Sequence, residues 1–277
     1  MRKRQGAKSQ NNRHPVTTAT QCRSAIFAPT LRPTADAATV VVETAWARAT
    51  ISRVRLTQVH RDILDVLFTH FEPHYREDGS CAFLFHPYAL LKKLHVTGNN
   101  TTWLRSKFDD LEIAGLEVRT PTYTVRTSIV RKHAWTADAR QYAVVLETEY
   151  MGFFQRDLHV HSEKLTDKII ALRHAPTKAL VRFMISHMSW NRSIVDTLGA
   201  IGYTGGERNR RIAVAKITSE AAVLARDFGI HVRDGRVTYT KHGEVWFENP
   251  PAAGGSFPIG RGGGGRIAPN RGADRSQ

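Results

Sequence analysis

The chain has 277 residues, 41% of them hydrophobic, which is enough for two ordinary domains with apolar cores. It carries 40 Lys and Arg against 25 Asp and Glu, a formal net charge of +15, and a surplus of this size predicts a polyanionic partner, most commonly nucleic acid. No run approaches the roughly 20 apolar residues of a membrane-spanning helix, and Cys22 and Cys81 form neither a CxxC pair nor a cysteine–histidine cluster. These features exclude a membrane partner, a disulfide framework and an ordinary zinc finger.

The two ends differ in composition from the middle of the chain. Residues 1–20 are polar and basic without an acidic residue, which predicts a disordered arm. Residues 250–277 are rich in glycine and arginine and predict a flexible tail. The N-terminal residues lack the apolar stretch of a secretory signal, so we expect a cytoplasmic protein.

Residues 21–150 predict a first domain. In chain order the expected elements are an amphipathic helix over 56–71, a strand over 81–85, a helix opened by Pro87 and ended at Gly98, a helix over 101–114, and two β-rich stretches over 122–135 and 141–150. Helix, strand, helix, turn, helix and hairpin is the order of a winged helix, in which the third helix enters a DNA groove.

Residues 151–249 repeat this order without repeating the sequence. The expected elements are a strand over 158–161, a short helix over 165–172, a helix opened by Pro176, a short helix over 194–201, a long helix over 207–228, and strands over 232–240 and 244–247. Asp234-Gly235 is a typical hairpin turn and predicts a second wing. The predicted fold class is therefore α+β, with two winged-helix domains in tandem.

Candidate DNA contacts in the first domain gather at the start of its third helix and on its hairpin. With Leu104 facing inward, short polar side chains face outward and one arginine lies on the flank, and such side chains can reach base edges and phosphates. The candidates are Asn99, Asn100, Thr102, Arg105 and Ser106 on the helix, and Arg126, Arg131 and Lys132 on the hairpin. Capping residues are also favoured at any helix start, and charges also protect edge strands, so both features have a structural explanation as well.

The second domain carries a denser basic cluster. Arg208, Arg210, Arg211 and Lys216 follow a Gly-Gly turn at the start of the long helix, and only Glu207 offsets them. With Ile217 facing inward, Arg208 and Arg211 project outward, whereas Arg210 falls nearer the core side. We expect this cluster to contact phosphates and guanines.

The sequence predicts no enzyme, cofactor or metal site. His159 and His161 share one face of a strand, a spacing that metal-dependent nucleases use, but no tyrosine is followed three residues later by lysine. No third histidine or carboxylate lies conveniently near the pair, so we interpret it as part of an ordinary strand. The chain also lacks GxxxxGK[ST], which excludes a P-loop.

Three segments make the chain resemble a known family. They are CRSAIF from Cys22, FHPYALLK from Phe85 with WLRSKF from Trp103, and APTKAL from Ala175 leading to Trp190. In these segments and in its layout the chain resembles bacterial plasmid replication initiators of the TrfA type. The resemblance implies origin recognition by both domains, local duplex opening, recruitment of the host initiator and helicase, and a monomer–homodimer equilibrium. Residues 39–45 then fit either a dimer contact or a simple packing strand.

Two functions follow from these patterns. The first is a plasmid replication initiator that binds repeated origin sites in double-stranded DNA. The alternative is a winged-helix transcriptional regulator without initiator activity.

Overall fold

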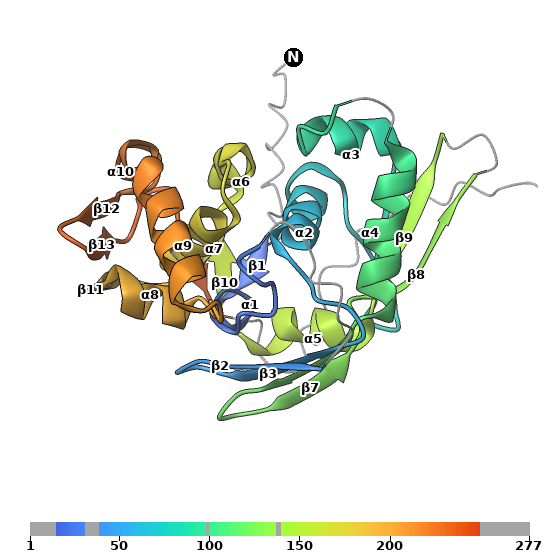
Figure 1. The fold of residues 1–277 in the computed structure, drawn as a ribbon. Helices are drawn as coiled ribbons and strands as arrows, with labels where there is room; N and C mark the ends of the chain where they lie inside the picture. The colour runs from blue at the N-terminus through green and yellow to red at the C-terminus, as the bar shows by residue number, and fades with distance from the viewer. Residues whose placement is uncertain (1–14, 31–38, 98–99, 137–139, 250–277) are drawn as a thin grey trace, which may run out of the picture.

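The computed structural model describes residues 15–30, 39–97, 100–136 and 140–249. Most of the predicted arm and the whole predicted tail, 250–277, lie outside these ranges. The described chain is a mixture of helices and sheets, as predicted, and its buried apolar side chains form two clusters. One cluster comes mainly from residues 16–154 and the other mainly from residues 160–245. We call the two parts the first and second units (Figure 1).

The N-terminal described segment is folded. Strand β1 (Thr17–Thr18) pairs antiparallel with β10 (His159–His161). Helix α1 (Ala19–Arg23) follows its N-cap residue Thr18, whose side chain and Gln21 form a reciprocal capping box. The predicted disordered arm, 1–20, therefore extends too far, because these residues contribute a strand and a helix start to the fold.

The first unit has the predicted element order around one sheet. Its elements are α2 (Gln58–His70), β4 (His74–Tyr75), β5 (Cys81–Phe85), α3 (Pro87–Lys93), α4 (Thr101–Ile113), β8 (Val130–Trp135) and β9 (Tyr142–Leu146). The sheet order is β4-β5-β9-β8, so that β5 pairs with the second strand of the β8–β9 hairpin. Leu104, Phe108 and Leu111 bury one face of α4 and leave the opposite face exposed.

A second sheet in this unit was not predicted. It has the order β2-β3-β6-β7 and consists of β2 (Val40–Glu43), β3 (Arg48–Ser52), β6 (Gly115–Arg119) and β7 (Thr124–Thr127). The stretch over 122–135 is therefore divided between two sheets. The division falls at buried Ile129, whose amide donates to the carbonyl of Leu111. The predicted strand over 141–150 likewise ends at Leu146, and α5 (Thr148–Arg156) crosses the predicted domain boundary at 150.

The second unit shares the order helix, strand, helix, helix and hairpin with the first and adds α6 and α10. It contains α6 (Glu163–Ala171), α7 (Ala175–Ile185), β11 (Ser189–Ser193), α8 (Ile194–Ala200), α9 (Glu207–Ser219), α10 (Ala221–Phe228), β12 (Ile230–Arg233) and β13 (Arg236–Thr240). Strand β11, which was not predicted, pairs with the second strand of the β12–β13 hairpin. The predicted single helix over 207–228 is two helices, because Glu220 turns inward and its carboxylate accepts the Arg173 amide at 2.8 Å.

The last described strand completes a fourth sheet. Strand β14 (Trp246–Glu248) was predicted as part of the second wing but pairs with β10 (His159–His161), giving the order β1-β10-β14. This sheet joins the N-terminal segment, the connection between the units and the C-terminal end of the second unit.

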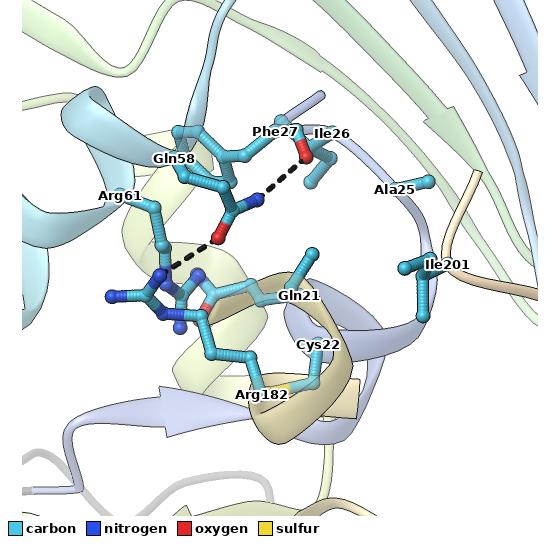
Figure 2. A pocket seen from close by; sticks show the side chains of 10 residues that line it. Gln21, Cys22, Ala25, Ile26, Phe27, Gln58, Arg61, Arg182 and Ile201 are labelled. Atoms are coloured by element: carbon cyan, nitrogen blue, oxygen red, sulfur yellow. Dashed lines mark hydrogen bonds between the residues drawn. The ribbon is translucent and has the colours of Figure 1, made fainter. Parts of the chain in front are cut away.

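Buried charged side chains lie where the two units meet. Helices α2 and α7 contact each other, and Arg182 of α7 bonds to Asp62, Asp65 and Gln58 of α2 at 2.6–2.8 Å. Lys178 bonds to Asp62 at 2.5 Å. Figure 2 shows Gln58 bridging this cluster to the carbonyl of Phe27 around a cavity of about 20 Å³, room for about one water molecule. The units are thus held together by a closely packed, hydrogen-bonded junction.

Candidate nucleic-acid interface

Helix α9 presents the densest group of exposed cations among the predicted site residues. It follows its N-cap residue Gly206 and packs through buried Ala213 and Ile217, so its other side faces outward. Arg208 and Arg211 are exposed, as predicted, and Arg210 is exposed too because it lies in the first turn, ahead of the core contacts. Lys216 is exposed on the flank, where it lines a groove with Pro29 and Tyr203.

The α9 cations are only weakly neutralised. Arg211 forms an i,i+4 ion pair with Glu207, and both side chains are more than three-quarters exposed, so water and salt screen the pair. Glu207 is the only acid among the helix residues, against four basic ones. The N-terminal end of a helix adds partial positive charge of its own. This end of α9 can therefore attract an anion such as a DNA phosphate.

The hairpin β12–β13 adds cations that the sequence reasoning did not select. Asp234 and Gly235 have φ angles of 49° and 69°, the left-handed conformations that a tight two-residue turn requires. Exposed Arg233 and Arg236 flank the turn, and Arg236 donates to Asn191 of β11 at 2.9 and 3.2 Å. In the sequence, the arginines on either side of the Asp-Gly turn could have indicated that this hairpin is basic.

Helix α4 holds its predicted polar residues at its exposed start. Asn100 caps the helix by accepting the Trp103 amide at 3.3 Å, and Thr102 and Ser106 are exposed. The Ser106 hydroxyl donates to the Trp103 carbonyl at 2.8 Å. Asn99 lies outside the described residues. The charge of α4 differs from that of α9, because its sequence holds two basic residues and three acidic ones.

Arg105 joins α4 to the β8–β9 hairpin. Its guanidinium lies 4.1 Å from the ring centre of Trp135, a cation–π contact. His133 of the same strand approaches Asp109 at 3.0 Å and Tyr142 at 3.0 Å. These contacts fix the hairpin against the helix and leave Lys132 exposed on β8.

Two predicted hairpin arginines lie elsewhere or are occupied. Arg126 is on β7, in the β2-β3-β6-β7 sheet rather than the hairpin, and pairs with Glu117 at 2.7 Å. Arg131 is on β8 but donates to Asp78 at 2.6 Å and to Glu147 at 3.0 Å. The structure therefore does not bring these two together with the start of α4 as free cations.

The two strand histidines do have a carboxylate beside them, contrary to the expectation from sequence. Strand pairing sets Glu248 directly opposite His159, and the candidate ligand atoms of His159, His161 and Glu248 all lie within 4.8 Å of one another. This group could not be predicted from the sequence, because 87 residues separate His161 from Glu248.

Among the described residues, no helix is long and apolar enough to cross a membrane. No protein-family model matches the sequence, and no curated protein matches it significantly.

The fold belongs to the α+β class. It is similar to domains 2 and 3 of RctB, a replication initiator, with a TM-score of 0.54. The similarity covers 82% of this chain and 99% of that chain at 12% sequence identity, so it concerns the fold alone.

Proposed function

We propose that this chain binds double-stranded DNA sequence-specifically through two winged-helix units and initiates plasmid replication at repeated origin sites. In each unit, a strand between two helices pairs with the second strand of the hairpin: β5 lies between α2 and α3 and pairs with β9, and β11 lies between α7 and α8 and pairs with β13. This is the frame in which a winged helix presents its third helix to the major groove. The corresponding helices are α4 and α9.

The exposed arginine cluster of α9 is the observation that carries the proposal. Arg208, Arg210 and Arg211 extend from one helix end, and the β12–β13 hairpin adds Arg233 and Arg236. Guanidinium groups are suited to bidentate contacts with guanine and with phosphate. A helix with a basic hairpin supplies both kinds of contact, because the helix reads bases while the hairpin holds the backbone.

The replication role rests on the fold similarity to RctB together with the tandem arrangement. Two DNA-reading helices in one rigid chain predict a binding site longer than one helical turn of DNA. Directly repeated sites of this kind, next to an AT-rich segment, suit an initiator that helps to open the duplex. The TrfA-type partners, a host initiator and helicase, and the monomer–dimer equilibrium belong to the same proposal.

Binding to the DNA upstream of the coding region tests the DNA-binding part. The full chain is titrated against this DNA and a scrambled duplex over a range of salt concentrations. We expect tighter binding to the upstream DNA that persists at moderate salt, and Arg208→Ala and Arg211→Ala should each weaken it. The matched control is Arg226→Ala, which also removes one positive charge, here from an exposed arginine that is already paired with Asp227.

Equal binding to both duplexes that collapses steeply with salt would contradict the proposal. The net charge would then supply only non-specific phosphate attraction. The alternative function, a transcriptional regulator, is favoured instead by tight binding to a palindrome without opening of the duplex.

A further inference from the structure

We propose that His159, His161 and Glu248 form a binding site for a divalent transition-metal ion of the Zn²⁺ class, which links β14 to β10. The three side chains share one face of the β1-β10-β14 sheet. His159 and His161 are two residues apart on β10 and so point to the same side, and Glu248 lies directly opposite His159 on the neighbouring strand. Their candidate ligand atoms lie within 4.8 Å of one another.

Each histidine has a hydrogen-bond acceptor at one ring nitrogen, and its other nitrogen can bind a metal ion. His159 Nε2 donates to the carbonyl oxygen of Phe154 at 2.5 Å, which leaves Nδ1 with its lone pair. His161 Nδ1 lies 3.2 Å from a carboxylate oxygen of Glu163 and Nε2 lies 2.9 Å from a carboxylate oxygen of Glu248. An acceptor behind each imidazole is the usual support of a metal-bound histidine.

The two carboxylates beside His161 make the site favourable for a cation. A neutral imidazole has one N–H and can donate to one of its two carboxylate neighbours. The second carboxylate oxygen of Glu163 is buried and has no hydrogen-bond partner among the described residues. A metal ion between His161 Nε2, Glu248 and His159 would satisfy Glu248, while the His161 Nδ1–H would stay with Glu163.

The surroundings protect such a site on one side and leave access on the other. His159 and His161 are 4% and 2% exposed, and the Trp246 ring stacks on His161 at 4.8 Å between ring centres. The Glu248 side chain is 62% exposed, so an ion can enter from that side. Two imidazoles and one carboxylate are a ligand set that suits Zn²⁺, with one position left for water.

Bound zinc would link β14, the C-terminal strand of the second unit, to β10, the strand that connects the two units. Metal binding of this kind adds directly to the stability of the folded state, because the unfolded chain does not hold the three ligands together. The role is structural and independent of DNA binding.

Zinc titration of the tag-free full chain, after removal of metals with a chelator, tests the proposal. Calorimetry should show about one Zn²⁺ bound per chain, with a zinc-dependent rise in the unfolding temperature. Glu248→Gln changes an exposed residue, keeps its size and should weaken binding at least tenfold. His161→Gln should do the same, and Glu163→Ala should weaken binding about 10- to 100-fold by removing the support of His161.

The control variant is His231→Gln, which removes an exposed histidine on β12 and should leave zinc binding unchanged. The proposal is overturned if the wild-type chain shows no saturable zinc binding, or if Glu248→Gln binds zinc as tightly as wild type. It is also overturned if the unfolding temperature of the wild-type chain does not rise with zinc.

Discussion

Arg182 of α7 contacts Asp62 of α2 with 2.6 Å between Nη2 and Oδ1, although 120 residues separate them in the chain. Asp65 accepts from the same guanidinium, and Arg61 completes the cluster by pairing with Asp65 at 2.8 Å. All of these side chains are almost fully buried. Since they come from both units, the cluster sets the position of one unit against the other.

Breaking this cluster should destabilise the whole protein. We expect Asp62→Ala to lower the free energy of unfolding by about 3–5 kcal/mol, because Lys178 and Arg182 would be left as buried charges without a full set of partners. Urea unfolding of the full chain measures the loss. Arg226→Ala, which breaks an exposed pair, should leave the free energy of unfolding close to that of wild type. An equally small change for Asp62→Ala would show that the cluster does not hold the units together.

The salt dependence of DNA binding should come mainly from the second unit. Helix α9 holds four basic residues and one acid, whereas α4 holds two basic residues and three acids. Replacing Arg208 and Arg211 with alanine should reduce the slope of log affinity against log salt by about 0.9 for each DNA phosphate that the variant no longer neutralises. Arg126→Ala removes a guanidinium already paired with Glu117 and should change the slope little. If Arg126→Ala reduced the slope more than the Arg208 and Arg211 substitutions did, the dominant contacts would lie in the first unit.

The Arg105–Trp135 contact should couple the first hairpin to α4. We expect a coupling energy of about 0.5–1 kcal/mol between the two side chains, the range for a cation–π contact that is not fully buried. Urea unfolding of Arg105→Ala, Trp135→Ala and the double variant gives this energy as a double-mutant cycle. Strictly additive effects of the two substitutions would mean that the contact contributes nothing to the stability of the hairpin.

Acid should destabilise the second unit through His187. Burial lowers the pKa of His187 to about 4, and its Nε2 is buried without a hydrogen-bond partner among the described residues. The unfolded chain, with a pKa of about 6.5 for histidine, binds a proton first. The stability contributed by neutral His187 is therefore full above about pH 6.5 and is lost as the pH falls towards 4.

Unfolding measured at pH 7.5 and pH 5 tests this expectation. His187→Phe keeps an aromatic ring beside Phe183 and Trp190 but cannot titrate, so it should reduce the loss of stability between the two pH values. Burial also lowers the pKa of His60, which leaves part of the loss in place. If His187→Phe loses as much stability between pH 7.5 and pH 5 as wild type does, His187 does not cause the acid destabilisation.

The helices that carry the candidate site could be predicted from sequence because their signals are local. Apolar spacing and capping residues mark the starts of α4 and α9, and the Asp234-Gly235 turn marks the second hairpin. The outward position of Arg208 and Arg211 followed from the helical period alone. Even there, the break at Glu220 was missed, since it depends on a distant amide, that of Arg173.

What the sequence left unpredicted depends on partners far apart in the chain. Asp62 and Asp65 lie on a helix that reads as amphipathic, and only the contact with α7 buries their side of it. The pairing of β14 with β10 brings Glu248 to the histidines, and no local pattern around either strand contains it. Arg126 was assigned to the wrong hairpin because two successive strands enter different sheets.

Footprinting on a supercoiled plasmid that carries the DNA upstream of the coding region tests the central claim most directly. The account predicts protection of directly repeated sites, each longer than one helical turn of about 10 base pairs, with thymines in an adjacent AT-rich segment becoming reactive to a single-strand probe. Protection should be lost in Arg208→Ala and Arg211→Ala and kept in Arg226→Ala. Protection of a single palindrome with the duplex closed, or no specific protection, would contradict it.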